Sequence, residues 1–162
     1  RFNFGFLIEA RLGTSRTIEL DYPTIDVEDV TLSPLQGTLE VTRTSEGVYL
    51  AGTLHTVTAV ACVRCLNDAY VPLSVTLSEL LYYPPWDAPA GELFIGEDGF
   101  IDLGPLVREL SLLEVPIQTV CRPDCLGLCQ ICGQNLNEGE CGCEDEEIDP
   151  RLAVLKKLLD EP

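Results

Sequence analysis

The sequence predicts an α+β fold: a predominantly antiparallel β-sheet or partly open barrel, with a packing helix and a C-terminal cysteine-rich zinc module. Three observations predict it. Long segments rich in β-branched residues fill the first half of the chain, one helical stripe of apolar residues follows them, and six of the eight cysteines lie close together near the C-terminal end. We expect residues 1–118 to form the β-rich body with one helix, and residues 119–162 to form the cysteine-rich module.

The strands of the body follow from alternating side chains. Aromatic and small residues alternate from Phe2 to Glu9, which is consistent with an opening strand. β-branched residues dominate Leu35 to Thr44 and Val48 to Val63, and the turn sequence Ser45-Glu46-Gly47 between them predicts a hairpin. Tyr70 to Tyr82 alternates again, so the chain should return as another strand beside the second one.

A loop and then a helix should complete the body. Prolines, glycines and acidic residues make Pro84 to Gly99 loop-like, and we expect its Trp86 to anchor the loop on the sheet. Asp102 is a plausible N-cap, and the helix after it should end near Leu113. Its apolar stripe should pack on the sheet and consists of Leu103, Leu106, Val107 and Leu110.

The cysteines carry the most specific signal. Six form the run Cys121-x3-Cys125-x3-Cys129-x2-Cys132-x8-Cys141-x-Cys143, and the pair Cys62-x2-Cys65 lies upstream at a predicted hairpin tip. Short pairs held by tight turns bring four sulfurs to within about 2.3 Å of one zinc ion. Gly133 can take the positive φ that such a turn often requires. The predicted ligands of one or two Zn2+ per chain are Cys62, Cys65, Cys121, Cys125, Cys129, Cys132, Cys141 and Cys143.

The division of these ligands between two sites is a hypothesis. Cys129, Cys132, Cys141 and Cys143 would make one site, and Cys121 and Cys125 would join Cys62 and Cys65 in the other, although Cys125 could replace either late cysteine. The second site would pin the cysteine-rich tail to the hairpin tip.

Three other interpretations of the cysteines stay open. The even number allows a disulfide framework, although a chain of this length can bury a core without one. The C-x2-C and C-x-C pairs could exchange disulfides, but no thioredoxin-like βαβ pattern surrounds them. Cys62 and Cys65 could also be small buried hydrophobic residues.

The charge balance bears on the partner. Twenty-seven acidic against ten basic residues give a formal net charge of −17, and each four-cysteine zinc site would add about −2. Such a field repels phosphate backbones, which favours a basic protein partner. A local patch of arginines could still contact RNA, and acidity that only keeps the protein soluble is an equal alternative.

Location and chemistry complete the expectations. No apolar run approaches a membrane span, so no membrane partner is expected, and the cysteine usage suits a reducing cytoplasm. The sequence contains no methionine, so the chain begins after its natural start or was trimmed, and a lost targeting segment stays open. His55 has no partners for a triad, and neither a phosphate loop nor an H-E-x-x-H sequence occurs. We therefore expect no enzymatic activity and no small-molecule substrate.

The end of the chain predicts a last helix behind an acidic tether, Glu144 to Glu147. Asp149 would be its N-cap and Pro150 its first residue. Its apolar face would dock either on this protein, which we favour, or on a partner, and it consists of Leu152, Leu155, Leu158 and Leu159.

Three segments together give a resemblance. They are "CVRCL" from Cys62, then Asp102-Leu103 with Leu112 to Pro116, then "GLCQICGQNLN" from Gly127 with "DPRLAVLKKL" from Asp149. In this order and spacing the chain, over about residues 35–160, resembles the YceD-like family, named for a large ribosomal RNA subunit accumulation protein.

The resemblance implies a bacterial or organellar cytoplasmic protein that supports accumulation of large-subunit ribosomal RNA in ribosome assembly, without known enzymatic activity. It implies that Cys62 and Cys65 correspond to the family's C-x-R-C-L element, and that the six later cysteines correspond to its downstream cluster. An acidic helper of this kind would engage a basic ribosomal or assembly protein. A zinc-stapled interaction module unrelated to ribosomes and a thiol redox protein are the alternatives.

Overall fold

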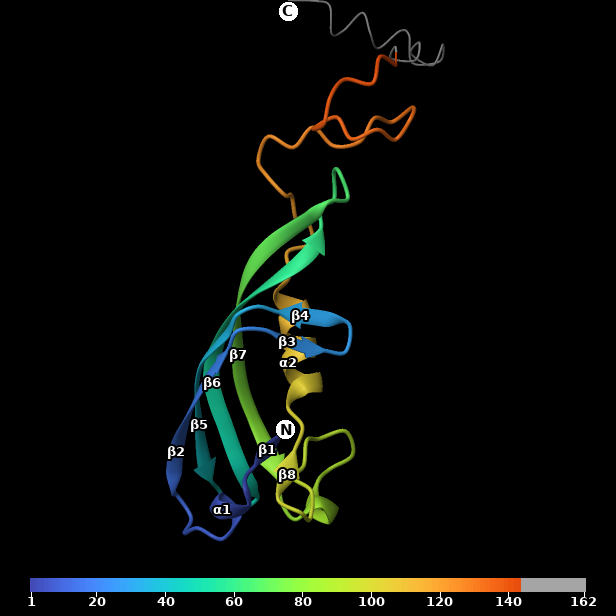
Figure 1. Cartoon of the computed structure of the whole chain (residues 1–162). Coiled ribbons are helices and arrows are strands. Elements are labelled where there is room, and N and C mark those ends of the chain that lie inside the picture. Colours follow the sequence, from blue (N-terminus) through green and yellow to red (C-terminus); the bar gives the residue numbers. More distant parts are fainter. Residues whose placement is uncertain (144–162) are drawn as a thin grey trace, which may run out of the picture.

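The computed structural model describes residues 1–143 and consists of an open antiparallel sheet, one main helix and a loop-rich end (Figure 1). Its elements are β1 (Phe2–Asn3), α1 (Gly5–Ile8), β2 (Ser15–Tyr22), β3 (Ile25–Val27), β4 (Val30–Leu32), β5 (Leu35–Arg43), β6 (Gly47–Ala61), β7 (Asp68–Tyr82), the 3-10 turn η1 (Pro85–Asp87), β8 (Phe100–Ile101) and α2 (Gly104–Glu114).

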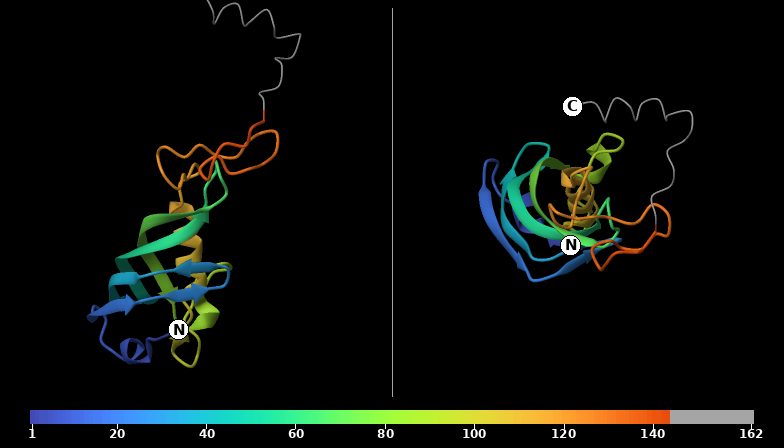
Figure 2. Two further views of the ribbon diagram at one scale, coloured as in Figure 1. Left: turned by 45° about the horizontal axis from the view of Figure 1, so that its top comes forward. Right: turned by 90° about the horizontal axis from the view of Figure 1, so that it is seen from above.

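The main sheet has the strand order β2-β5-β6-β7 and is antiparallel throughout, as predicted. Two small antiparallel pairs, β1 with β8 and β3 with β4, accompany it. The main sheet curves around α2 (Figure 2). It does not close into a barrel, because β2 and β7 are its two edge strands and do not pair with each other within residues 1–143.

Two glycines allow neighbouring strands to approach closely where the sheet bends. A Cβ on Gly37 of β5 would lie 2.3 Å from the carbonyl oxygen of Thr53, and one on Gly52 of β6 would lie 2.2 Å from that of Thr38. Real Cβ atoms do not tolerate such distances, so any side chain here would push β5 and β6 apart. Glycines inside strands are typical of this kind of close approach and bend.

The hydrophobic core lies between the concave face of the sheet and α2. Its even-numbered β6 and odd-numbered β7 positions include Leu50, Leu54 and Leu77, which are almost completely buried. Each such leucine contributes about 1.5–3 kcal/mol relative to an exposed one. From α2 and its entry, Leu103 and Val107 close this core, so the predicted packing of the helix on the sheet is confirmed.

Several local expectations were wrong. The strand predicted over Phe2 to Glu9 ends at Asn3, whose side-chain oxygen accepts a hydrogen bond from the N–H of Gly5 (2.8 Å) and turns the chain into α1. Strand β2 was not predicted, because its residues are mixed. Trp86 does not anchor its loop on the sheet, since 72% of it is exposed.

The start of α2 differs slightly from the expectation. Leu103, not Asp102, occupies the N-cap position, while the Asp102 carboxylate accepts a hydrogen bond from the N–H of Gly104 (2.9 Å). Pro105 follows in the first turn, where its missing N–H costs no hydrogen bond. The last helix predicted from Asp149 lies outside the described residues. Among residues 1–143, no helix is both long and apolar enough to cross a membrane.

Candidate metal centre

The first cysteine set lies at the tip of the β6–β7 hairpin. Cys62 and Cys65 occupy the turn between the two strands. The chain that leaves α2 runs to this tip (Figure 1), where Cys121 and Cys125 lie against them. The Sγ atoms of Cys62 and Cys125 are 3.9 Å apart, and those of Cys65 and Cys121 are 3.6 Å apart. All four sulfurs lie within 4.8 Å of one another.

These sulfur distances fit a metal tetrahedron rather than disulfides. A Zn–S bond of about 2.3 Å in tetrahedral geometry separates the sulfurs by about 3.8 Å, whereas a disulfide needs about 2.05 Å. All eight cysteines are free thiols. The donor set of the first site therefore suits a soft or borderline divalent ion such as Zn2+.

Backbone contacts hold the two chain segments of the first set together. The N–H of Val63 donates to the carbonyl oxygen of Thr119 (2.9 Å), and the N–H of Leu128 donates to that of Arg64 (3.1 Å). The Arg64 guanidinium donates to the carbonyl oxygen of Cys125 (2.9 Å). The hairpin tip is thus paired on both sides with the loop that carries the later cysteines.

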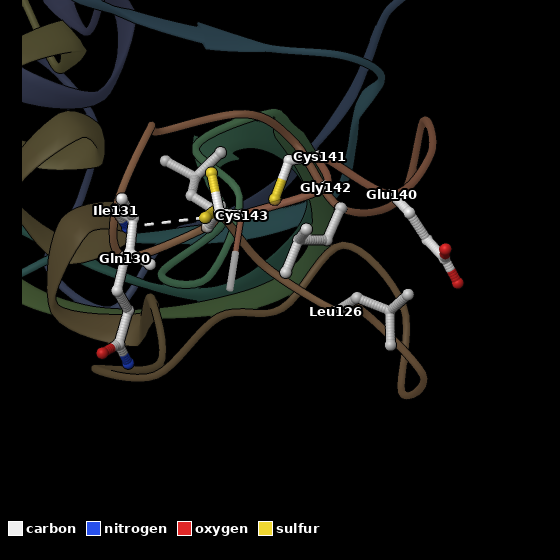
Figure 3. A pocket seen from close by; sticks show the side chains of 10 residues that line it. Leu126, Gln130, Ile131, Glu140, Cys141, Gly142 and Cys143 are labelled. Carbon is white, nitrogen blue, oxygen red and sulfur yellow. Dashed lines mark hydrogen bonds between the residues drawn. The ribbon is translucent and has the colours of Figure 1, made fainter. Parts of the chain in front are cut away.

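The second set comprises Cys129, Cys132, Cys141 and Cys143, whose sulfurs also lie within 4.8 Å of one another. Figure 3 shows the sulfurs of Cys141 and Cys143 beside a hollow that Leu126 and Ile131 also line. Cys132 and Cys143 are exposed, whereas three members of the first set are buried. The two sets therefore share their chemistry but differ in access to solvent.

The two C-x2-C turns have the same backbone hydrogen bonds. In the first, the N–H of Arg64 donates to the Cys62 sulfur (3.4 Å) and the N–H of Leu66 donates to the Cys62 carbonyl oxygen (3.0 Å). In the second, the N–H of Ile131 donates to the Cys129 sulfur (3.4 Å) and the N–H of Gly133 donates to the Cys129 carbonyl oxygen (2.9 Å).

The equivalent residues Leu66 and Gly133 also share a positive φ, 62° and 74°. Glycine adopts this conformation without strain, as expected for Gly133, whereas leucine does so rarely. The repeat of one turn geometry around both first cysteines is what two sites of the same type require.

Without a cation, the thiols within each set differ widely in pKa, so they do not all ionise together. Burial opposes ionisation of Cys62, but backbone N–H groups directed at its sulfur outweigh burial and hold its pKa at about 6. Backbone N–H groups likewise lower the pKa of Cys129 to about 6. Burial and the neighbouring sulfurs raise the pKa of Cys121 to about 12, and the neighbouring sulfurs of its set do the same to Cys143. A divalent cation at the centre would stabilise all four thiolates of a set together.

Asn137 was not among the predicted site residues, but it connects the two sets. Its side-chain nitrogen donates to the Cys125 sulfur (3.4 Å), and its side-chain oxygen accepts hydrogen bonds from the N–H of Leu126 (2.9 Å) and from the Arg122 guanidinium (2.7 Å). Along the chain it lies between Cys132 and Cys141 of the second set. An amide residue enclosed by cysteine pairs was the available signal in the sequence.

The structure groups the eight sulfurs as the sequence-based hypothesis divided them, with Cys125 in the first set. His55 belongs to neither set. It lies exposed on the outer face of β6, where its Nδ1 is 3.1 Å from the hydroxyl of Ser74. His55 is therefore a surface residue of a strand and not part of a metal site.

An antiparallel sheet with a packed helix, joined at a hairpin tip to a loop-rich segment with two four-thiol sets, defines the class: a small α+β protein with two sites suited to metal. The chain belongs to the YceD family, because the family model described as "Large ribosomal RNA subunit accumulation protein YceD" matches residues 50–159. The resemblance read from the sequence is thereby confirmed.

Individual relatives agree with this family. The chain is 41% identical over 125 residues to an uncharacterized protein of Mycobacterium tuberculosis (strain ATCC 25618 / H37Rv), which covers 75% of the chain and 60% of the relative. It is 27% identical over 159 residues to the chloroplastic "Large ribosomal RNA subunit accumulation protein YCED homolog 1" of Arabidopsis thaliana, covering 80% of the chain and 50% of the relative.

YlbN, an uncharacterized protein of Bacillus subtilis (strain 168), is 35% identical over 105 residues, which are 60% of the chain and 58% of that protein. The chain thus spans 60% or less of the length of these relatives. No solved structure matches the chain significantly.

Proposed function

We propose that this protein is a non-enzymatic factor that supports accumulation of large-subunit ribosomal RNA during ribosome assembly, and that two zinc ions hold its cysteine-rich end in place. The relatives named as large ribosomal RNA subunit accumulation proteins support the first part. The observation that carries the second part is the pair of four-thiol sets, with sulfurs at the spacing of a tetrahedral zinc site.

The zinc ions would be structural. Four thiolates fill the coordination shell of zinc and leave no open position for a substrate or an activated water molecule. In this proposal residues 1–118 form the body and residues 119–162 form the module that zinc attaches to the β6–β7 tip. In the first set, the buried positions of Cys62, Cys65 and Cys125 argue against thiols that turn over disulfides there, because such thiols must be accessible.

The partner would be a basic protein of the ribosome or of its assembly. The chain carries a net charge of −17, so its field attracts cationic proteins and repels RNA backbones. Action in the bacterial cytoplasm, or in an organelle, fits such a partner and a set of cysteines that bind metal as thiolates.

A complementation experiment tests the RNA part of the proposal. A Bacillus subtilis strain without YlbN would express either this chain or its Cys62→Ser/Cys129→Ser variant, and the ratio of large- to small-subunit ribosomal RNA would be measured. We expect loss of YlbN to lower the ratio, the unchanged chain to restore it and the variant to fail. An unchanged ratio in the strain without YlbN, or no rescue by a well-expressed chain, would count against the proposal.

Metal content tests the zinc part separately. Elemental analysis of protein purified without added metal or chelator should give about two zinc ions per chain. We expect Cys62→Ser to lose one of them and Cys62→Ser/Cys129→Ser to lose both. Protein without metal and with paired oxidised thiols would refute the zinc sites and favour the disulfide or redox interpretations.

A further inference from the structure

Strand β2 is an unpaired edge strand of the main sheet. It pairs with β5 on one side only, and within residues 1–143 no strand lies on its other side (Figure 2). An edge strand presents unpaired backbone N–H and C=O groups, which can hydrogen-bond to another extended chain. The side chains on the two faces of β2 then determine which chain fits.

The outer face of β2 is acidic. Its side chains alternate along the strand, so Thr17, Glu19 and Asp21 share the solvent face with Glu40, which is the neighbour of Thr17 on β5. The outward positions of β2 and β5 include no lysine or arginine. Arg16 lies on the opposite face, with its guanidinium 5.3 Å from the ring centroid of Phe6.

Beyond Arg16, the inner face of β2 is apolar from Ile18 to Tyr22. Ile18 packs against the hydrophobic core and Leu20 is buried in it. Leu20 and Tyr22 also line a cavity of about 220 Å3, which Leu103 and Val107 close on the side of α2. Apolar side chains that lie beside Leu20 would therefore extend an existing core.

We propose that the free edge of β2 binds an extended segment of a basic protein, and that cationic and apolar residues alternate along this segment. Added beside β2, such a segment would place its cationic side chains opposite Glu19 and Asp21 and its apolar side chains opposite Ile18 and Leu20. Residues directly opposite each other on adjacent strands lie on the same face, so both patterns are satisfied in one register. The backbone hydrogen bonds give affinity, and the alternation gives specificity.

A second copy of this chain is a poor partner for the free edge of β2. Pairing β2 with β2 would bring Glu19 and Asp21 of one copy beside the same carboxylates of the other. Arg16 could not relieve this repulsion, because it lies on the opposite face. Two chains of net charge −17 also repel each other at long range.

The inference deepens the proposed function, on which its choice of a basic protein rests. A defined probe tests it: a fluorescent peptide of alternating lysine and valine, matched in length to the eight residues of β2. The comparison peptides are alternating glutamate and valine, a lysine block followed by a valine block, and the first peptide with all of its backbone amides methylated, so that neither edge can donate hydrogen bonds. Binding is measured by fluorescence anisotropy at physiological salt.

We expect only the alternating lysine–valine peptide to bind tightly, and methylation of its amides to abolish binding. The Glu19→Lys/Asp21→Lys variant should bind it tenfold or more weakly, which corresponds to about 1.4 kcal/mol. Glu92→Lys/Glu97→Lys is the matched control, because it changes the net charge equally at exposed positions away from β2. Unchanged zinc content and circular dichroism would show that both variants fold.

Three results would overturn the inference: equal binding of the methylated peptide, equal losses in both double variants, or a stable dimer in sedimentation that excludes the peptide. The assay contains no ribosomal RNA. Its failure would therefore remove this surface and leave the RNA proposal intact, whereas failure of the complementation experiment would not alter the binding result.

Discussion

Replacing Asn137 should weaken the first metal site although Asn137 lies in the loop of the second. Asn137→Ala removes the donor to the Cys125 sulfur and the acceptor for the N–H of Leu126 and for Arg122. Groups that orient a metal ligand typically contribute 10- to 100-fold in metal affinity, or about 1.4–2.8 kcal/mol. The side-chain nitrogen of Asn137 also donates to the side-chain oxygen of Asn135 (2.8 Å). Four lost hydrogen bonds of about 1 kcal/mol each, partly replaced by water, give a similar value.

The assay measures zinc affinity by competition with a chelating dye in two backgrounds. Cys129→Ser/Cys132→Ser isolates the first site, and Cys62→Ser/Cys65→Ser isolates the second. We expect Asn137→Ala to lower affinity 10- to 100-fold in the first background and less than threefold in the second. Asn137→Asp should have a larger effect, because it places a carboxylate beside the Cys125 thiolate.

Gln130→Ala is the matched control, because Gln130 is an exposed residue of the same segment and should leave both sites unchanged. If Asn137→Ala weakens only the second site, or neither, the orienting role inferred from the hydrogen bonds is wrong.

Three further predictions concern the two sites and the body. Zinc release to a chelating dye should be biphasic, and Cys62→Ser should remove the slow phase and Cys143→Ser the fast one, since the second set is more exposed; a single phase would contradict this. Gly133→Ala should lower zinc affinity about fivefold, or about 1 kcal/mol, whereas Leu66→Gly should not lower it, because only leucine is strained at a positive φ; a loss in Leu66→Gly would show that its side chain matters more than its φ. Arg108 donates a hydrogen bond to the Asp29 carboxylate and forms an ion pair with it, which lowers the pKa of Asp29. The stabilisation from this pair should be present at neutral pH and should fade below about pH 4, as Asp29 takes up a proton. Urea unfolding of Asp29→Asn should therefore depend less on pH in this range.

The parts of the fold that the sequence predicted are those with strong periodicity. The alternation in Val48 to Val63 and Tyr70 to Tyr82 predicted β6 and β7 to within a few residues, because a half-buried strand must alternate. Strand β2 carries the mixed run from Ser15 to Tyr22 and has only Leu20 buried. An edge strand that buries so little has no hydrophobic alternation that the sequence could reveal.

The same contrast holds at the cysteines. Metal chemistry restricts spacing, so C-x2-C turns are visible in a sequence, and the two sulfur sets match the expected division. The place of Asn137 between cysteine pairs was only a weak signal of a positioning role, because its contacts come from folding a loop back on Cys125. The exposure of Trp86 was equally hidden, because a tryptophan between prolines has the same sequence whether or not it packs.

The position of the first set explains why metal would matter to this fold at all. Beyond the main core, the hairpin tip has a second cluster of buried residues that consists of Cys62, Cys65, Ala69 and Cys125, with Val60 and Leu128 packed against it. Three of its four buried members are candidate ligands, so little apolar surface is left to hold the loops of residues 116–143.

A segment this poor in apolar burial needs another source of stability. Structural zinc sites supply apparent binding energies of about 10–16 kcal/mol, which act as folding energy for the segment that binds the metal. The main sheet has its own leucine core, so we expect it to fold without them. Loss of the first metal should therefore detach the cysteine-rich end and leave the body folded, so that a Cys62→Ser protein would retain the circular dichroism of the sheet while losing the proposed function in ribosomal RNA accumulation.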